Sequence, residues 1–290
     1  MNKISFFSLP HKNFDIDKFI YYALKEDIGI GDHTSISIIS PDKKNKASLI
    51  IKEDGILAGI EFARKIFMTV DKNLKITIYK NDGSRIKKGD IAFTIAGNIR
   101  SILAAERVVL NCMQRMSGIA TMTNKFVNLC KPYPVKVIDT RKTTPGIRAL
   151  EKWAVKIGGG YNHRFGLYDM ILIKNNHIDF AGGISQAIES ANEYLKKKKL
   201  NLKVEIEARN IREVNEIISI GKIDRIMLDN FAISEIKKAI QLIGKKFEVE
   251  ISGGINEKNI RKYAACGADY ISVGALTHSV KNLDMSLTAI

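Results

Sequence analysis

Six short apolar runs in the second half of the chain each end on a polar residue or a glycine, and these ends carry the residues best suited to chemistry. In chain order they are Asp139, Lys174, Glu207, Asp229, Ser252 and Gly274. One charged strand end has an ordinary explanation, since strands commonly finish at the solvent. In a parallel barrel, however, all C-terminal strand ends lie on one face, and that face holds the active site. The pattern therefore predicts that all six ends lie together at one opening of a barrel, called the mouth below.

Basic residues dominate this predicted mouth. Arg141 and Lys142 follow the first run, His163 and Arg164 precede the second, and Lys174 closes it. Such a site suits a ligand with several negative charges, because the guanidinium fork of arginine matches carboxylate and phosphate groups.

Two glycine-containing turns and two carboxylates complete the set. The Ser252-Gly253-Gly254 and Gly274 turns follow the last two runs, where bare backbone N–H groups commonly cradle a phosphate. Glu207 and Asp229 are suited to accept hydrogen bonds from sugar hydroxyls, or to hold magnesium through water. A sugar phosphate, a second polyanion and metal assistance together indicate glycosyl or phosphoryl transfer.

From residue 135 the chain shows a regular alternation of expected strands and helices, and these elements must position the residues named above. The expected strands are Val135–Asp139, Met170–Lys174, Val204–Glu207, Ile226–Asp229, Val249–Ser252 and Tyr270–Gly274. Helix-length amphipathic segments lie between most of them: Ala181–Tyr194, Ile211–Ile220, Ile233–Ile243 and Glu257–Ala265. Buried strands that alternate with helices predict a parallel sheet. The number of units and the short connections favour a closed or nearly closed β/α barrel over a doubly wound sheet.

The N-terminal third has a mixed α and β pattern. Helices are expected over Phe14–Glu26 and Glu61–Val70, and strands over Ala47–Lys52, Leu74–Lys80 and Ile91–Ala96. A long apolar helical stretch runs from Ile102 to Leu129, and we expect an interruption near Ser117-Gly118.

Composition limits the class of protein. Hydrophobic residues make up 45% and charged residues 27% of the 290 residues, as in a soluble globular protein. No apolar run approaches the roughly 18 residues needed to cross a bilayer, and Met1–Phe14 lacks the pattern of a signal peptide. We therefore expect a cytoplasmic protein with no membrane partner. The three cysteines form no Cys-x-x-Cys pair, which argues against a zinc site or a disulfide framework.

The net charge of +15 raises the alternative of a nucleic-acid-binding protein. The lysines are spread along the chain, and the one tight run, Lys196–Lys199, closes an expected helix, where cations suit the helix dipole. No interleaving of aromatic and basic residues supports nucleic-acid binding, so we expect no such partner.

Several segments, taken in order, resemble the quinolinate phosphoribosyltransferases. The core motifs are Asp139-Thr-Arg-Lys-Thr-Thr-Pro-Gly-Ile-Arg148, Gly158-Gly-Gly-Tyr-Asn-His-Arg-Phe-Gly-Leu167 and Leu172-Ile-Lys-Asn-Asn-His177. Further matches are Asp27–Ser35, Glu106–Asn111, Gln114–Thr121, Leu228–Phe231, Ile251–Ile255 and Gly274–His278. The resemblance covers roughly residues 20–287, and nine motifs in sequence are far more specific than one.

The resemblance implies an α/β fold with two domains. Residues 1–115 would form an N-terminal α/β sandwich that the C-terminal segment 278–290 joins, and residues 116–277 would form an incomplete, open β/α barrel of the type II phosphoribosyltransferase kind. It also implies a homodimer, in which the N-terminal domain of one subunit covers the barrel mouth of the other, and in some members a hexamer.

The resemblance also implies the reaction. Phosphoribosyl passes from phosphoribosyl pyrophosphate to quinolinate, with decarboxylation, to give nicotinate mononucleotide, pyrophosphate and CO2 for NAD biosynthesis. Magnesium would assist, held by Glu207 and Asp229 through water.

Site residues carry over position by position. The dicarboxylate pocket would be lined by Arg141, His163, Arg164 and Lys174, with Arg107 donated across the dimer interface. Lys142, with Lys174, would approach the phosphoribosyl donor, and Glu207 and Asp229 would serve the ribose hydroxyls. The catalytic set is thus Lys142, Lys174, Glu207 and Asp229. The 5-phosphate would lie on Ser252, Gly253, Gly254, Gly274 and Ala275.

Plainer readings apply to some of these residues. By its helical position alone, Arg107 would be a surface cation over apolar neighbours. His163 has the alternative of a structural histidine, although its place beside Arg164 favours a ligand role. Glu205 is assigned to the opposite strand face from Glu207 and to a structural salt bridge.

Two related enzymes remain as alternatives. A nicotinate phosphoribosyltransferase would share the barrel but bind one carboxylate and need fewer cations. A molybdenum-transport-associated relative is also similar, but the complete Arg141-Lys142 and His163-Arg164 pairs argue against it.

Overall fold

The computed structural model describes residues 14–290, so the signal-peptide expectation for residues 1–13 lies outside the described part. These residues divide into two compact units. Unit 1 contains the chain up to Asn124, Pro145–Gly159 and Val280–Ile290; unit 2 contains Lys125–Thr144 and Gly160–Ser279. Within residues 14–290, no helix is both long and apolar enough to span a membrane.

Unit 1 is built on an antiparallel sheet with strand order β12-β1-β5-β3. The strands are β1 (Lys44–Ile51), β3 (Lys75–Ile78), β5 (Ile91–Asn98) and β12 (Met285–Ala289). Ser48 of β1 pairs with Thr288 on one side and with Thr94 on the other. The C-terminal segment therefore forms an edge of the N-terminal sheet, as the resemblance implies. A two-stranded ribbon, β2 (Gly55–Ile56) with β4 (Arg85–Ile86), completes the strands described in this unit.

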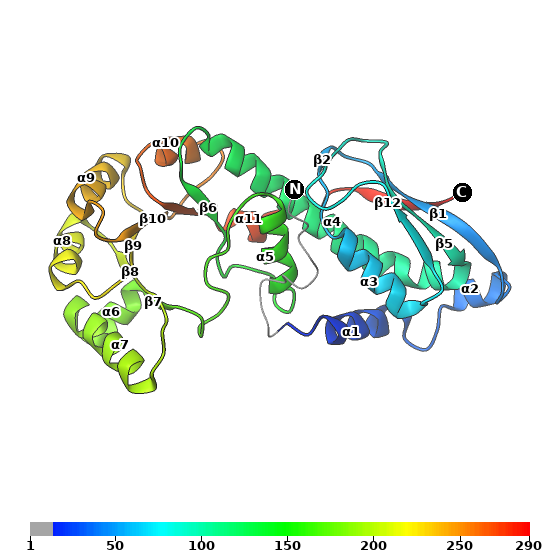
Figure 1. Ribbon diagram of the computed structural model, residues 1–290, viewed down its shortest axis with the longest axis horizontal. Coiled ribbons are helices and arrows are strands. Elements are labelled where there is room, and N and C mark those ends of the chain that lie inside the picture. Colours follow the sequence, from blue (N-terminus) through cyan, green and yellow to red (C-terminus); the bar gives the residue numbers. More distant parts are fainter. Residues whose placement is uncertain (1–13) are drawn as a thin grey trace. The chain divides into compact units, whose positions relative to one another are not determined.

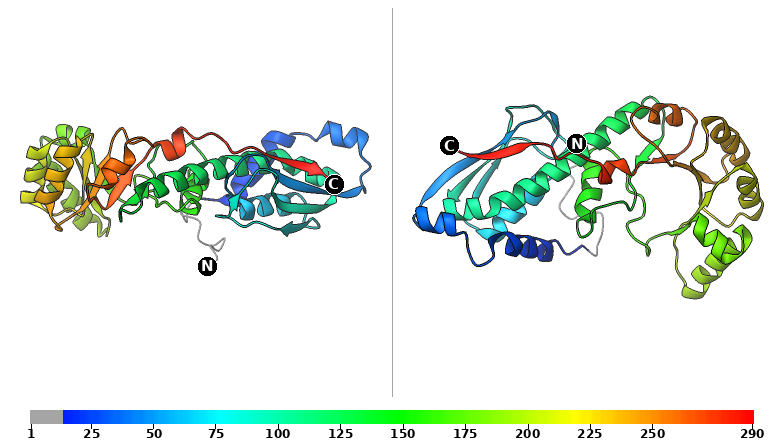
Figure 2. Two further views of the ribbon diagram at one scale, coloured as in Figure 1. Left: turned by 90° about the horizontal axis from the view of Figure 1, so that it is seen from above. Right: turned by 180° about the vertical axis from the view of Figure 1, so that it is seen from behind.

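The helices of unit 1 include three that lie on predicted segments and two, over His33–Ile38 and Arg148–Ile157, that were not predicted from the sequence. They are α1 (Ile16–Ile28), α2 (His33–Ile38), α3 (Ile60–Val70), α5 (Arg148–Ile157) and the first part of α4 (Ile99–Cys130), and Figures 1 and 2 show α3 and α4 running along the sheet. Phe67 of α3 meets Phe93 of β5 edge-on, with ring centroids 6.0 Å apart. Both rings are buried, and such a pair adds about 0.5–1.5 kcal/mol to the stabilisation from burial alone.

The predicted interruption of α4 at Ser117-Gly118 is wrong, because the helix is continuous from Ile99 to Cys130. Ser117 is fully buried, and its hydroxyl bonds the backbone N–H and C=O of Ala58 at 3.0 and 3.1 Å. A Cβ at Gly118 would lie 2.3 Å from the carbonyl oxygen of Lys281. These two small residues therefore permit close packing of the helix and do not break it.

The start of α3 is capped by a residue distant in sequence. Its N-cap position is Gly59, which has no side chain to accept the first N–H groups. Asp82 supplies the acceptor, with Oδ1 2.9 Å from the N–H of Ile60. The carboxylate thus ties α3 to the turn before β4.

Replacing Asp82 with alanine should lower the free energy of unfolding of unit 1 by about 1 kcal/mol, the usual cost of a lost N-cap. Urea denaturation followed by circular dichroism measures this change. The exposed neighbour Asn81 provides the control, and equal midpoints for Asp82→Ala and Asn81→Ala would contradict the capping role.

Unit 2 contains the predicted parallel sheet, with strand order β6-β11-β10-β9-β8-β7. The strands are β6 (Lys136–Ile138), β7 (Ile171–Ile173), β8 (Val204–Ala208), β9 (Arg225–Asp229), β10 (Glu248–Ser252) and β11 (Tyr270–Ser272). All five neighbouring pairs are parallel. Since β6 and β7 are the two edges, the sheet is an open barrel, as expected.

Helices cover the outside of this barrel, as Figure 1 shows for α7 to α9. They are α6 (Asn175–Ala181), α7 (Ile184–Lys198), α8 (Ile211–Ile220), α9 (Ile233–Ile243) and α10 (Ile260–Ala264). The short helix α11 (Ala275–His278) instead follows β11 at the carboxyl ends of the strands. Buried side chains of α8 and α9 recur at the helical spacing, including Val214, Ile217, Ile236 and Ala239. The lysine run closes α7, as predicted, and Lys199 follows in the left-handed conformation.

Candidate active site

A pocket of about 940 Å³ lies at the carboxyl ends of the barrel strands, entirely within unit 2. The strand register brings the ends together; Ser252 of β10, for example, pairs with Asp229 of β9. The predicted site residues that line it are Arg141, Lys142, His163, Arg164, Lys174, Glu207, Asp229, Ser252, Gly253, Gly254, Gly274 and Ala275. The pocket therefore brings together every predicted site residue except Arg107.

Arg107 is an exposed residue of α4 in unit 1. It lines a second, smaller pocket of about 380 Å³ together with Asn111 of the same helix and with residues of α1 and α5, including Tyr22 and Leu150. The position is compatible with both interpretations of the sequence, a surface cation or a residue offered to another subunit.

The segment that carries His163 and Arg164 is paired with β6 through backbone hydrogen bonds. Tyr161 forms a parallel bridge with Ile138, and its N–H bonds the carbonyl of Val137 at 2.9 Å. The carboxylate of Asp139, which is fully buried, accepts the N–H of His163 at 2.9 Å. Its second oxygen accepts from the Asn162 side-chain amide at 2.6 Å, so both oxygens act as acceptors, as a carboxylate allows. These contacts place His163 and Arg164 in the same pocket as Arg141.

Arg164 is the most buried of the arginines in the pocket, at 9% exposure. Its Nη1 donates to the carbonyl of Met170 at 3.1 Å. Burial, followed by the positive charge of Arg141, lowers the pKa of Arg164 from its ordinary value. Two guanidinium groups close enough to repel one another form a strong attraction for an anion that neutralises both.

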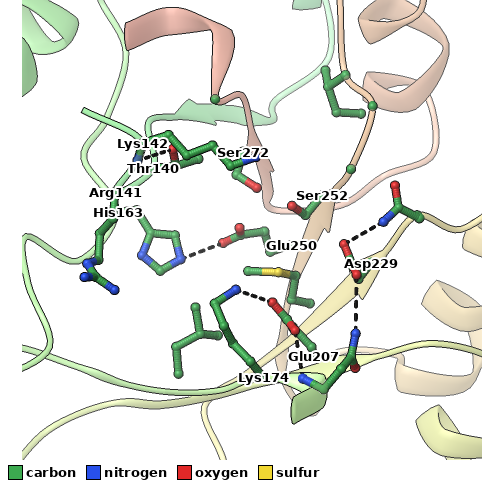
Figure 3. A pocket seen from close by; sticks show the side chains of 18 of the residues that line it. Thr140, Arg141, Lys142, His163, Lys174, Glu207, Asp229, Glu250, Ser252 and Ser272 are labelled. Atoms are coloured by element: carbon green, nitrogen blue, oxygen red, sulfur yellow. Dashed lines mark hydrogen bonds and ion pairs between the residues drawn. The ribbon is translucent and has the colours of Figure 1, made fainter. Parts of the chain in front are cut away.

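Lys174 and Glu207 form an ion pair across neighbouring strands. Lys174 Nζ lies 2.5 Å from Glu207 Oε1, and Glu207 Oε2 accepts the N–H of Asn175 at 2.9 Å. Figure 3 shows both side chains pointing into the pocket from β7 and β8. The lysine side chain remains about half exposed (48%), so it can still contact a ligand.

Asp229 completes this side of the pocket. Its oxygens contact the side-chain amides of Asn230 at 3.1 Å and Asn175 at 3.4 Å. Burial, and next the negative charge of Glu207, raises the pKa of Asp229. Glu207 and Asp229 are thus a pair of like charges that a cation between them would stabilise.

The turns after β10 and β11 are open to the pocket. Gly253 has φ +97°, and a Cβ there would lie 2.9 Å from the backbone nitrogen of Asn230, so only glycine fits between the two loops. Around Gly254 a Cβ would meet nothing within 4 Å. The backbone of this turn is therefore accessible to a ligand, as a phosphate cradle requires.

The structure corrects the assignment of Glu205. Residues two apart on a strand share a face, so Glu205 and Glu207 both point into the barrel, and the predicted opposite orientation is wrong. The predicted ion pair is present: Glu205 Oε2 lies 3.1 Å from His163 Nε2 and 3.7 Å from Arg225 Nη1. Burial, and next the charge of Glu250, raises the pKa of Glu205 to about 7.

His163 is held by two carboxylates at the base of the pocket. Its Nε2 lies 3.1 Å from Glu205 and 3.4 Å from Glu250, and its side chain is 6% exposed. Burial lowers the pKa of His163, but the two acidic partners outweigh burial and raise it to about 9. A proton is therefore held on the nitrogen that faces the carboxylates.

Sequence reasoning missed Glu250 and Asn175, which also line the pocket. Glu250 lies two residues before Ser252 on β10, so strand alternation from Ser252 would have placed it on the inner face. Asn175 directly follows Lys174 and had no comparable signal. His278 also lines the pocket, and no role was predicted for it from the sequence.

Known proteins show which family shares these features. A sequence model described as the quinolinate phosphoribosyl transferase N-terminal domain matches residues 32–117, and one described as its C-terminal domain matches residues 119–288. The mitochondrial quinolinate phosphoribosyltransferase [decarboxylating] 2b of Nicotiana tabacum is 45% identical over 96% of this chain and 83% of its own length. A probable nicotinate-nucleotide pyrophosphorylase [carboxylating] of Bacillus subtilis is 42% identical over 94% of this chain and 92% of its own.

A solved structure supports the same conclusion. The crystal structure of NadC from Streptococcus pyogenes superimposes with a TM-score of 0.91 at 38% identity and covers 100% of both chains. With both domain models matched in order and relatives that share more than two-fifths of their residues, the chain belongs to the quinolinate phosphoribosyltransferase family.

Proposed function

We propose that this protein transfers the phosphoribosyl group of phosphoribosyl pyrophosphate to quinolinate and releases CO2 and pyrophosphate, with nicotinate mononucleotide as the product. The observation that carries the proposal is the composition of the barrel-mouth pocket, where four cationic side chains (Arg141, Lys142, Arg164 and Lys174) share one cavity with the open glycine turns. Its volume of about 940 Å³ suits two bound ligands together. The names of the relatives support the same reaction.

The dicarboxylate would bind at the wall formed by Arg141 and Arg164, with Lys174 opposite. Charge-assisted hydrogen bonds from these side chains would hold both carboxylates and orient the pyridine nitrogen toward C1 of the sugar. Arg107 would join this set from the neighbouring subunit of a homodimer, an arrangement that its exposure on α4 supports. Assembly of dimers into a hexamer is a further expectation from the family resemblance.

The phosphoribosyl donor would occupy the other side of the pocket. Its 5-phosphate would lie on the backbone of Ser252, Gly253, Gly254, Gly274 and Ala275. Glu207 and Asp229 would accept hydrogen bonds from the ribose hydroxyls, while Lys142 and Lys174 would approach the pyrophosphate. A Cβ at Gly274 would lie 3.2 Å from Lys142 Cδ, which supports a shared role for this lysine and this turn.

Magnesium fits the Glu207–Asp229 pair. The raised pKa of Asp229 reflects burial and the negative charge of Glu207, and Mg²⁺ is typically bound by one or two carboxylates, waters and substrate phosphates. When bound there, the ion would neutralise charge on the pyrophosphate. Lys174 adds a positive charge of the protein at the same place, because its Nζ forms an ion pair with one oxygen of Glu207.

The chemistry requires no covalent enzyme nucleophile. The nitrogen of quinolinate forms a bond to C1 as the bond to pyrophosphate breaks, and the sugar passes through an oxocarbenium-like state. Cations fixed at the pocket stabilise the departing charge. The positive ring nitrogen then stabilises the electron pair left on C2 when the adjacent carboxylate departs as CO2, and C2 takes a proton.

The proposal is tested by incubating purified protein with phosphoribosyl pyrophosphate, magnesium and either quinolinate or nicotinate. We expect nicotinate mononucleotide and CO2 from quinolinate alone, and we expect chelation of magnesium to abolish the turnover. Preferential use of nicotinate would refute the dicarboxylate assignment, and turnover of neither substrate would refute the proposed reaction.

We also propose a cytoplasmic location. The sequence favours the cytoplasm, whereas plant relatives are named mitochondrial or chloroplastic.

A further inference from the structure

A column of charged side chains runs through the barrel interior below the pocket, and the proposed reaction does not use it. Arg225 of β9 contacts two residues of β10, with Nη1 3.1 Å from Glu250 and Nη2 3.1 Å from Glu248. Glu250 is fully buried, and so is Glu205 on β8, 3.7 Å from the same Nη1. Below Glu248, Tyr270 donates to its carboxylate at 2.9 Å.

His163 forms the upper end of this column. Its Nε2 faces Glu205 and Glu250, and its Nδ1 accepts the N–H of Arg164 at 2.6 Å. Because Nδ1 needs a lone pair to accept this hydrogen bond, we assign the ring proton to Nε2, and this contact opposes the second protonation that the two carboxylates favour. The ring is therefore held at both nitrogens, and Figure 3 shows it between Arg141 and Glu250.

Buried carboxylates are unexpected in a pocket for anions, because they are costly to desolvate and repel a dicarboxylate. His163, Glu205 and Glu250 have the donor atoms for a metal ion, since these atoms lie within 4.8 Å of one another. The guanidinium of Arg225 already balances Glu250 from below, however, and would repel such an ion. The arrangement suits the fixing of a side chain better than the binding of a metal.

We propose that Glu250, backed by Arg225, is a positioning residue of the dicarboxylate pocket that acts through His163. The carboxylate holds the imidazole in one orientation, and the imidazole in turn holds the backbone of Arg164, whose guanidinium faces the anion site with Arg141. The direct contact with the substrate predicted for His163 stays a prediction, and the indirect role is proposed beside it. This inference rests on the proposed function, since the anion concerned is quinolinate.

The test compares Glu250→Gln with Glu248→Gln. The two glutamates share a strand, a face and the contact with Arg225, but only Glu250 contacts His163 and lines the pocket. We expect Glu250→Gln to raise KM and the calorimetric Kd for quinolinate about tenfold, which equals about 1.4 kcal/mol. KM for phosphoribosyl pyrophosphate should stay within about twofold, because its side of the pocket is unaltered. Glu248→Gln should change neither constant.

A double-mutant cycle separates positioning from a general structural effect. In a His163→Gln background the added effect of Glu250→Gln should vanish, because the residue through which it acts is gone. Equal effects of the two glutamate variants, or full additivity with His163→Gln, would overturn the inference. If Glu250→Gln is too unstable to assay, His163→Gln is measured in its place. It should weaken quinolinate binding and leave KM for phosphoribosyl pyrophosphate unchanged. Unchanged quinolinate binding in His163→Gln would overturn the inference.

Failure of the proposed function has a different signature. A wild-type protein that binds quinolinate without turning it over would refute the reaction, while the binding constants of the variants would still decide the inference. A wild-type protein that neither binds nor converts quinolinate overturns both.

Discussion

Replacing Arg141 with alanine should lower kcat/KM for quinolinate by at least about a hundredfold. Arg141 and Arg164 line the same pocket, and the charge of Arg141 lowers the pKa of Arg164, so we expect one anion to contact both. Each charge-assisted hydrogen bond contributes about 1.5–3 kcal/mol, and a lost orienting contact also misaligns the ring nitrogen with the sugar carbon. Steady-state kinetics with purified protein measures the loss.

Two further variants make this result specific. Arg141→Lys keeps the charge but loses the planar fork, so its activity should lie between that of the wild type and that of Arg141→Ala. Lys238→Ala removes an exposed cation of α9 outside the pocket and should leave kcat/KM unchanged. Near-normal turnover by Arg141→Ala would remove this residue from the substrate clamp.

Repeating local patterns made unit 2 predictable from the sequence. Each apolar run became a strand of the parallel sheet, and five of the six run ends line the pocket, because parallel strands in one barrel point the same way. The sixth run end, Asp139, is fully buried and accepts the N–H of His163 instead. The direction of a run and its last residue are local properties, and the geometry of the barrel then places Lys174, Glu207 and Asp229 together. No knowledge of side-chain packing was needed for this step.

The predictions that were wrong or missing concern residues whose roles depend on contacts between distant segments. The glycine at 118 looked like a break in the helix, yet its role is to admit the carbonyl of Lys281, which lies more than 150 residues away. Glu250 and Arg225 became part of the site's support only when three strands placed them beside His163. Such contacts depend on register and side-chain geometry, which a single sequence does not specify. The error on Glu205 was of another kind, because alternation alone assigns it to the same face as Glu207.

The second large effect is the recovery of activity when two inactive variants, one of them altered at Arg107, are combined in one dimer. If each active site combines the barrel of one subunit with Arg107 of the other, Arg107→Ala and Lys174→Ala should each be nearly inactive. A hybrid dimer would nevertheless contain one site with both native residues. Since one of its two sites is native, the isolated hybrid should have about half of the wild-type activity per dimer. An unsorted mixture of equal amounts should have about one quarter, because random pairing makes only about half of the dimers hybrids. Coexpression with two affinity tags isolates the hybrid, and its turnover with quinolinate is the measurement.

The matched control pairs two variants of the same barrel. Arg141 and Lys174 both line the pocket of unit 2, so a hybrid of Arg141→Ala and Lys174→Ala has one defect in each site and should stay inactive. Recovery in the first hybrid alone would identify Arg107 as a residue shared between subunits, because only a contribution from the partner can separate the two defects. Equal inactivity of both hybrids, with the tags proving that they formed, would return Arg107 to the plainer interpretation of a surface cation on α4.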